Sequence, residues 1–163
     1  MVNRLTHVND AGAARMVDVT AKDVTARSAT ARGRVEVSAV VIELLRGDGV
    51  PKGDAIATAR IAGIMATKRT PDLIPLCHPL AIGGVEVDLD ILDGAAGGGG
   101  VVAITATVRT ADRTGVEMEA LTAVSVAALT IVDMVKAVDK LARITDIEVV
   151  AKSGGKSGDW TRA

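Results

Sequence analysis

The sequence predicts an α+β fold of the ferredoxin-like type, with an antiparallel sheet packed against helices in a single domain over residues 1–163. Residues 85–92 and 102–108 alternate apolar and polar side chains, as half-buried strands do. Residues 54–68 form a well-capped helical stretch, and residues 116–141 form a longer, almost entirely apolar one. The resulting order of strand, helices, two strands, helix and strand is that of a ferredoxin-like unit.

The other strands are predicted from shorter signals. Residues 15–19 and 31–37 are candidate strands ahead of the first helix, and residues 146–151 form the last strand. The glycine run at 94–100 joins two predicted strands and opens no helix. It therefore favours a flexible hairpin loop over a phosphate-binding loop.

Helix boundaries are marked by capping residues. Ser38 is expected to cap a short helix that ends at Gly47. Asp54 is a good N-cap for the next helix, which Pro71 is expected to stop. The helix predicted over 116–141 is apolar on nearly every face, so it should be buried on nearly every face. A domain of this size leaves one face to solvent, so we expect a subunit interface there and an oligomer.

Composition and charge exclude several classes of function. The formal net charge is −1, so no global positive field attracts nucleic acid, and Trp160 is the only aromatic residue on which bases could stack. The uncharged stretch 120–132 is shorter than the roughly 20 residues that span a bilayer. The N-terminus has no apolar run like a signal peptide, and a single cysteine fits a reducing compartment. We therefore expect a cytoplasmic protein that binds neither nucleic acid nor membrane.

Residues 72–80 hold the only cysteine and one of the two histidines, between two prolines. A residue before proline is disfavoured in the α region. Leu76, Cys77 and His78 are therefore expected to form a short, stiff, non-helical segment that presents an imidazole at a fixed place. A proline-rich connector without a chemical role has the same pattern.

Lysines next to glycine are candidate anion-binding groups. Lys52 lies just before a predicted helix N-terminus, where free amides attract anions, although a solvated lysine in a turn is the alternative. The tail at 152–158 contains a Gly-Lys-Ser sequence like that of a P-loop, but Val150 stands where that motif needs glycine. The tail is consistent with anion binding through its backbone amides, or with a disordered basic end.

Two groups of charged residues lie on the long predicted helix. Asp133 and Lys136 are three residues apart and share a face. A surface ion pair is the ordinary interpretation. On so apolar a helix we instead expect the pair at a cleft or interface, where acid–base chemistry becomes possible. Glu117 and Glu119 begin the same helix, which acidic residues stabilise without any further function. The corner between strand and helix could also hold a ligand.

Taken together, these stretches resemble the molybdenum cofactor biosynthesis protein C family, the cyclic pyranopterin monophosphate synthases. The resembling segments follow the chain in order and cover almost all of it: 5–7, 16–19, 52–54, 57–63, 72–80, 115–122, 125–130 and 151–159. The resemblance implies a phosphorus–oxygen lyase that converts the cyclised dihydro-GTP intermediate to cyclic pyranopterin monophosphate and releases pyrophosphate, an early step of molybdenum cofactor biosynthesis. It also implies a ferredoxin-like fold and a homohexamer, a trimer of dimers, with active sites at subunit boundaries.

Matched motif by motif, the resemblance also implies site residues. Catalytic roles fall on Asp133, Lys136, Lys52 and His78. Substrate contacts fall on Leu76, Cys77, His78, Met118, Glu119, Lys152 and Arg27. Local lysines would compensate the triphosphate charge, and a lysine near an aspartate can transfer protons. The resemblance implies no protein-bound metal, and it leaves open Mg²⁺ that accompanies the triphosphate or pyrophosphate.

Without the family resemblance, the residues leave two other interpretations open, each from a different class of protein. One is a non-catalytic nucleotide sensor that binds through the glycine–lysine tail. The other is a purine-remodelling hydrolase of the GTP cyclohydrolase type. Such a hydrolase normally needs zinc, and one cysteine with two scattered histidines is a poor zinc ligand set.

Overall fold

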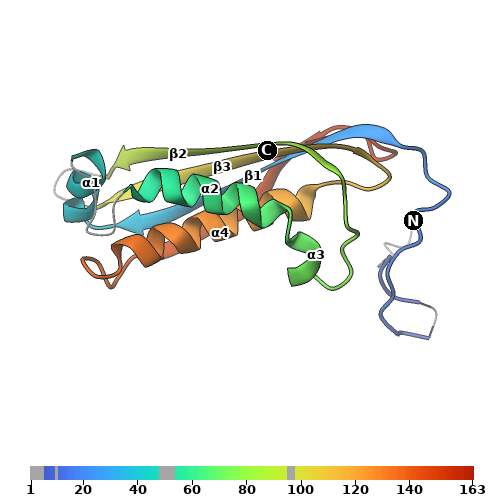
Figure 1. Ribbon diagram of the computed structural model, residues 1–163, viewed down its shortest axis with the longest axis horizontal. Helices are drawn as coiled ribbons and strands as arrows, with labels where there is room; N and C mark the ends of the chain where they lie inside the picture. The colour runs from blue at the N-terminus through green and yellow to red at the C-terminus, as the bar shows by residue number, and fades with distance from the viewer. Residues whose placement is uncertain (1–5, 10, 48–53, 95–97) are drawn as a thin grey trace.

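The computed structural model describes residues 6–9, 11–47, 54–94 and 98–163, and in it a twisted antiparallel sheet carries the helices on one face (Figure 1). The elements are β1 (Thr25–Val37), α1 (Ala39–Arg46), α2 (Ala55–Thr67), α3 (Thr70–Leu73), β2 (Ile82–Asp93), β3 (Gly100–Asp112), α4 (Glu117–Val135), β4 (Arg143–Ser153) and β5 (Trp160–Thr161).

The five strands are arranged in the order β2-β3-β1-β4-β5, and every neighbouring pair is antiparallel. β1 is central, with Ala31 opposite Ala106 of β3 and Val149 of β4. The chain passes from β1 through α1, α2 and α3 to the β2–β3 hairpin, and from there through α4 to β4. The prediction of an antiparallel sheet packed against helices is therefore confirmed.

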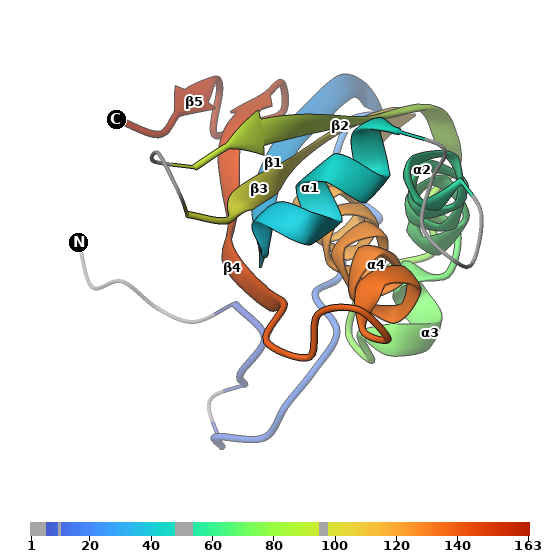
Figure 2. The same cartoon turned by 90° about the vertical axis from the view of Figure 1, so that its left-hand side faces the viewer.

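The core lies between the sheet and α4, and it is built mostly from alanine, valine and isoleucine. Small residues let the layers approach closely. A Cβ atom on Gly33 of β1 would lie 2.5 Å from Val124 Cγ1 of α4, and one on Gly63 of α2 would lie 3.0 Å from the Ala123 carbonyl oxygen. Helices α2 and α4 consequently pack side by side against the same face of the sheet (Figure 2).

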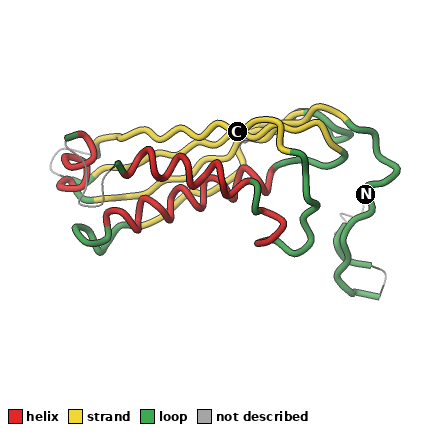
Figure 3. Tube along the Cα trace, in the orientation of Figure 1, coloured by secondary structure: helices red, strands yellow, loops and turns green. Residues whose placement is uncertain are grey.

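The structure corrects the predicted strands in two places. Residues 15–19 form no strand: they lie in the loop before β1 and pair with none of the five strands of the sheet. The described residues before β1 are loop apart from one isolated bridge between Val8 and Ala14 (Figure 3). The two-residue strand β5 was not predicted, since so short an edge strand leaves no periodic pattern.

Two helix boundaries differ from the predictions. α2 ends at Thr67 with Lys68 as its C-cap, close to the predicted end, but Pro71 does not stop it. Pro71 instead lies in the first turn of α3, where its missing N–H costs nothing. α4 ends at Val135 rather than near residue 141. The chain turns there because the buried Asp139 carboxylate accepts hydrogen bonds from the backbone N–H groups of Ser38, at 2.7 Å, and Leu141, at 2.9 Å.

Other helix ends agree with the sequence. Ser38 and Gly47 flank α1 as predicted, although the Ser38 side chain makes no capping hydrogen bond. The Asp54 side chain caps α2 by accepting from the Ala57 N–H at 2.8 Å.

Helix α4 is long and apolar enough to cross a membrane by length and composition alone, with 19 residues and a mean hydropathy of 1.7. More than half of it is buried against the sheet and α2, so a core helix accounts for its composition. The outward face of the helical layer remains apolar and exposed, with Ile61 at 59%, Met65 at 61% and Leu129 at 58% of their full exposure.

Candidate functional site

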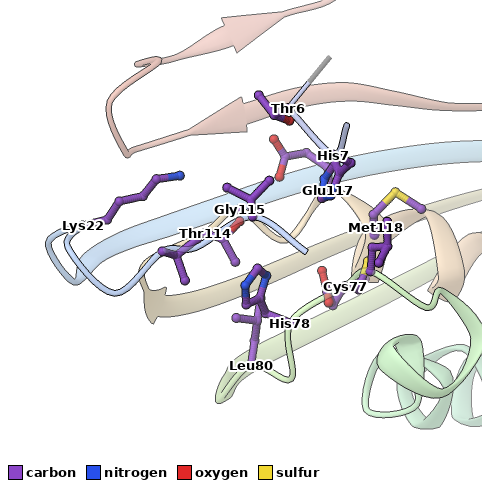
Figure 4. Close-up of a pocket in the computed structure, with 14 residues that line it drawn as sticks. Thr6, His7, Lys22, Cys77, His78, Leu80, Thr114, Gly115, Glu117 and Met118 are labelled. Atoms are coloured by element: carbon purple, nitrogen blue, oxygen red, sulfur yellow. The ribbon is translucent and has the colours of Figure 1, made fainter. Parts of the chain in front are cut away.

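A cavity of about 300 Å³, here called the histidine cavity, lies where α4 begins. Its walls come from the N-terminal segment, the loop before β2 and the corner between β3 and α4 (Figure 4). Both histidines of the chain line it. Its polar and sulfur-bearing lining residues are Thr6, His7, Lys22, Cys77, His78, Thr114, Glu117, Met118 and Glu119.

The proline-bracketed segment supplies one wall. The Cys77 N–H donates to the Ile74 carbonyl at 3.0 Å, which closes a tight turn with Pro75 at its second position, a position proline favours. The chain then runs without regular structure to β2. Leu76, Cys77 and His78 are half-buried and all three line the cavity, so the segment presents the imidazole at a fixed place as expected.

The first turn of α4 supplies a second wall. Glu119 is only 3% exposed. Burial raises the pKa of its carboxyl, a hydrogen bond from its own backbone N–H partly opposes this, and the nearby Glu117 carboxylate raises the pKa further. Burial also raises the pKa of the Cys77 thiol, with a further contribution from Glu119. The cavity therefore contains a carboxyl that takes up a proton more readily than an exposed one.

A second cavity, of about 210 Å³ and here called the polar cavity, adjoins the first. It shares Lys22 and Glu117 with the histidine cavity and adds Arg27 and Lys152. A third, more open cavity of about 810 Å³ is lined by Lys22, Arg27 and Lys156. Lys22 lines all three, so four cationic side chains border a group of adjoining cavities, here called the depression.

The glycine-rich tail, residues 152–158, contributes lining residues to the second and third cavities. Gly154 and Gly155 have φ values of +83° and +72°, which glycine adopts readily. A Cβ atom on Gly155 would lie 2.1 Å from Arg27 Nη1. Arg27 is itself held by donation from its Nε to the Asp112 carbonyl at 2.8 Å. The glycines therefore make room for the arginine.

The Asp133–Lys136 pair lies elsewhere. Lys136 Nζ is 2.6 Å from Asp133 Oδ1, and the two side chains are 60% and 55% exposed. Neither residue lines any of the three cavities. Asp133 follows Glu119 by 14 residues, about 20 Å along a helix at 1.5 Å per residue. Within one chain the pair therefore cannot reach a ligand held between His78 and Glu119.

The predicted site residues thus fall into separate groups. Leu76, Cys77, His78, Met118 and Glu119 line the histidine cavity, Arg27 and Lys152 line the polar cavity, and Asp133 and Lys136 lie at the far end of α4. Lys52 lies outside the described residues.

The structure adds two cavity-lining residues that were not assigned a role from the sequence, His7 and Lys22. Asp18 lines none of the three cavities but interacts electrostatically with His78. The Asp18 carboxylate accepts from the Thr20 hydroxyl at 2.6 Å and the Thr20 N–H at 2.9 Å; these bonds lower its pKa, with a further contribution from the charge of His78. Segments 5–7 and 16–19 already carried part of the family resemblance. No pattern within them marked a side chain, because a loop has no periodicity that predicts direction.

Metal-binding residue types are present but scattered. Among residues 6–9, 11–47, 54–94 and 98–163, no three or more His, Cys, Asp or Glu side chains are grouped so as to hold a metal ion.

Comparisons with known proteins agree on one family. The model of the MoaC family matches residues 16–155. A cyclic pyranopterin monophosphate synthase from Streptomyces coelicolor is 73% identical over 161 residues, covering 99% of this chain and 91% of the relative. Those from Streptomyces griseus and a Nocardioides species are 74% and 71% identical, covering 98% of this chain and 87% and 96% of the relatives.

Proposed function

The chain belongs to the MoaC family, and from this premise we propose that its histidine and polar cavities bind a GTP-derived triphosphate and turn it into a pterin. The chain is an enzyme that forms cyclic pyranopterin monophosphate, an early step of molybdenum cofactor biosynthesis. The substrate is the cyclised dihydro-GTP intermediate, and pyrophosphate is the second product.

The distribution of charge supports this binding mode. The chain as a whole has a net charge of −1, so it has no general attraction for a triphosphate. Lys22, Arg27, Lys152 and Lys156 nevertheless border the joined cavities. Such cations bind phosphoryl oxygens and stabilise the charge that develops as pyrophosphate leaves. The phosphates accordingly occupy the polar side of the depression, and the purine-derived part lies in the histidine cavity.

Proton transfer is assigned to the histidine cavity. Opening the purine-derived ring and closing the pyran ring both require protons to move at several atoms. His78 is half-buried in the cavity wall, and Glu119 is a buried carboxyl with a raised pKa. A carboxyl whose pKa is closer to neutral is a better proton donor and acceptor than an exposed one.

A complete site requires a second chain. Asp133 and Lys136 lie at the end of α4 remote from both cavities, so we assign them to the cavity of a neighbouring subunit. The catalytic role proposed for Lys52 rests on the family resemblance alone. The exposed side chains of Ile61, Met65 and Leu129 supply an apolar surface for that contact. The assembly proposed is a homohexamer, a trimer of dimers, of ferredoxin-like subunits. The order β4-β1-β3-β2 within the sheet supports that classification.

Two further features complete the proposal. The enzyme acts in the cytoplasm, which the single free Cys77 supports. Mg²⁺ enters with the triphosphate or leaves with pyrophosphate rather than occupying a protein site. Turnover measured with and without a chelator would test the second point.

The direct test is incubation of the purified protein with the cyclised dihydro-GTP. We expect cyclic pyranopterin monophosphate and pyrophosphate in equal amounts. His78→Ala should abolish most turnover while the fold is kept, and Arg109→Ala on the sheet is a matched control that should remain active. Binding without turnover in the wild-type protein would favour the nucleotide-sensor alternative.

The shared site has its own test, which uses two inactive variants. Asp133→Asn and His78→Ala are unfolded together and refolded as mixed oligomers. If each site takes His78 from one chain and Asp133 from its neighbour, random mixing of equal amounts leaves about a quarter of the sites intact. Activity should therefore return to about that fraction of the wild-type value. Mixed oligomers without activity would show that each chain uses its own Asp133.

A further inference from the structure

His7 is anchored through its side chain as well as its backbone. The Arg15 N–H donates to the His7 carbonyl at 2.9 Å, and His7 Nδ1 lies 3.3 Å from the Arg15 carbonyl oxygen. Beyond this pair the chain forms a small turn, in which Asn9 Oδ1 accepts from the N–H groups of Ala11 and Ala13. The imidazole therefore stands at the base of a closed loop and has a defined orientation.

The anchor sets the tautomer of the ring. A backbone carbonyl can only accept, so Nδ1 of His7 must carry the hydrogen of this bond. In a neutral imidazole the other nitrogen, Nε2, then has a free lone pair and can only accept. This arrangement, with one ring nitrogen bonded to a carbonyl and the other left for a ligand, is the one that orients functional histidines.

His7 also faces the cavity that His78 faces. The two imidazoles come from segments about 70 residues apart, and they are the only histidines of the chain. Figure 4 shows both among the lining side chains, which also include Glu117 and Met118. Closure of the N-terminal turn does not require this ring, because Asn9 already accepts from two backbone amides of the turn.

We propose that His7 is a substrate-binding residue of the histidine cavity, whose Nε2 accepts a hydrogen bond from a hydroxyl or N–H group of the nucleoside-derived part of the substrate. Triphosphate oxygens at neutral pH offer no hydrogen to donate, so the bond goes to the base or sugar rather than to the phosphates. This inference rests on the proposed function, and it divides the site into a nucleoside side at His7 and a phosphate side at Lys152.

Two substitutions separate this role from simple anchoring. The amide of His7→Asn stands near the position of Nδ1, so it can keep the bond to Arg15 but leaves nothing at Nε2. The amide of His7→Gln reaches the position of Nε2 and can still accept from the substrate. We expect His7→Asn to weaken GTP binding by roughly three- to tenfold, the effect of one lost hydrogen bond, and His7→Gln to restore most of it.

Calorimetry with two probes makes the test specific. GTP carries both the nucleoside and the phosphates, and inorganic tripolyphosphate carries the phosphates alone. His7→Asn should weaken only the binding of GTP, whereas Lys152→Ala should weaken the binding of both GTP and tripolyphosphate. Asn9→Ala controls for loosening of the N-terminal turn and should leave both affinities near wild type.

Three results would overturn the proposal. The first is that His7→Asn loses equal affinity for GTP and for tripolyphosphate, and the second is that His7→Asn keeps full GTP affinity while His7→Gln loses it. The third is that Asn9→Ala loses as much GTP affinity as His7→Asn does. Failure of the proposed function would appear differently, as absence of turnover by the wild-type protein whatever these affinities are.

Discussion

Lys152 Nζ lies 3.0 Å from Glu117 Oε1, so an ion pair joins the end of β4 to the first turn of α4 at the border of both cavities. The two side chains are each 31% exposed. Glu117 folds back over the preceding turn, where a Cβ atom on Gly115 would lie 2.0 Å from Glu117 Oε2. The lysine assigned to phosphate binding is thus partly neutralised by its own chain before a substrate arrives.

Replacing this carboxylate should free the lysine. We expect Glu117→Gln to bind GTP about two- to fivefold more tightly, because a partly exposed ion pair is worth about 1 kcal/mol or less. Calorimetry at two salt concentrations measures the effect, which should diminish at the higher one. Glu86→Gln removes a carboxylate paired with Arg109 outside the cavities and should change nothing. Unchanged or weaker GTP binding in Glu117→Gln would mean that Glu117 does not compete for Lys152.

The buried Glu119 carboxyl should lower the stability of the folded state near neutral pH. Its folded-state pKa is raised, so the folded state resists ionisation of this carboxyl. The resulting loss of stability is absent below the unfolded-state pKa, near 4.3, and is complete above the folded-state pKa. Glu119→Gln should therefore have a higher Tm than wild type at pH 8, and the difference should shrink at pH 4. Turnover should be largely lost. A Tm difference that grows toward acid pH would contradict the assignment.

Asp139 should act in the opposite sense. Burial disfavours its charge, but hydrogen bonds from the Ser38 and Leu141 N–H groups outweigh burial and lower its pKa. Its stabilising contribution is present above the unfolded-state pKa, near 3.9, and is lost as the pH falls through the folded-state pKa. Asp139→Asn should lose about 1–2 kcal/mol at pH 7 in urea unfolding and less at acid pH. The exposed Asp146→Asn is the control, and an equal loss there would refute the special role of Asp139.

Close packing of α4 on β1 should make Gly33 hard to replace. A Cβ atom there meets the fully buried Val124 at 2.5 Å, and the bulged strand β4 leaves Ile147 Cγ1 3.1 Å away on another side. We expect Gly33→Ala to cost about 1–3 kcal/mol of unfolding free energy, the usual effect of overpacking. Gly84→Ala on β2 meets no atom within 4 Å and should be neutral or slightly stabilising. Equal stability of the two variants would contradict this account.

The periodicity of apolar residues in the sequence predicted most of the secondary structure. The alternation over residues 85–92 and 102–108 marked β2 and β3, and the cap at Asp54 marked α2 within one residue. Sequence periodicity did not predict the strands correctly where strand formation depends on a pairing partner elsewhere in the chain. Residues 15–19 were predicted as a strand but pair with none of the strands of the sheet, whereas the unpredicted β5 pairs with β4 over two residues.

The sequence by itself determined the chemical content of this protein: a family recognisable from ordered motifs, an apolar long helix, and a proline-bracketed segment that presents His78. Tertiary structure alone decided which of those groups meet. It placed His7, His78 and Glu119 around one cavity and Lys152 beside Glu117, and it left Asp133 and Lys136 at the opposite end of α4. The reason is physical. Motifs specify side-chain chemistry locally, whereas the distance between them follows from helix length and strand order, and a rigid helix of 19 residues keeps its two ends apart.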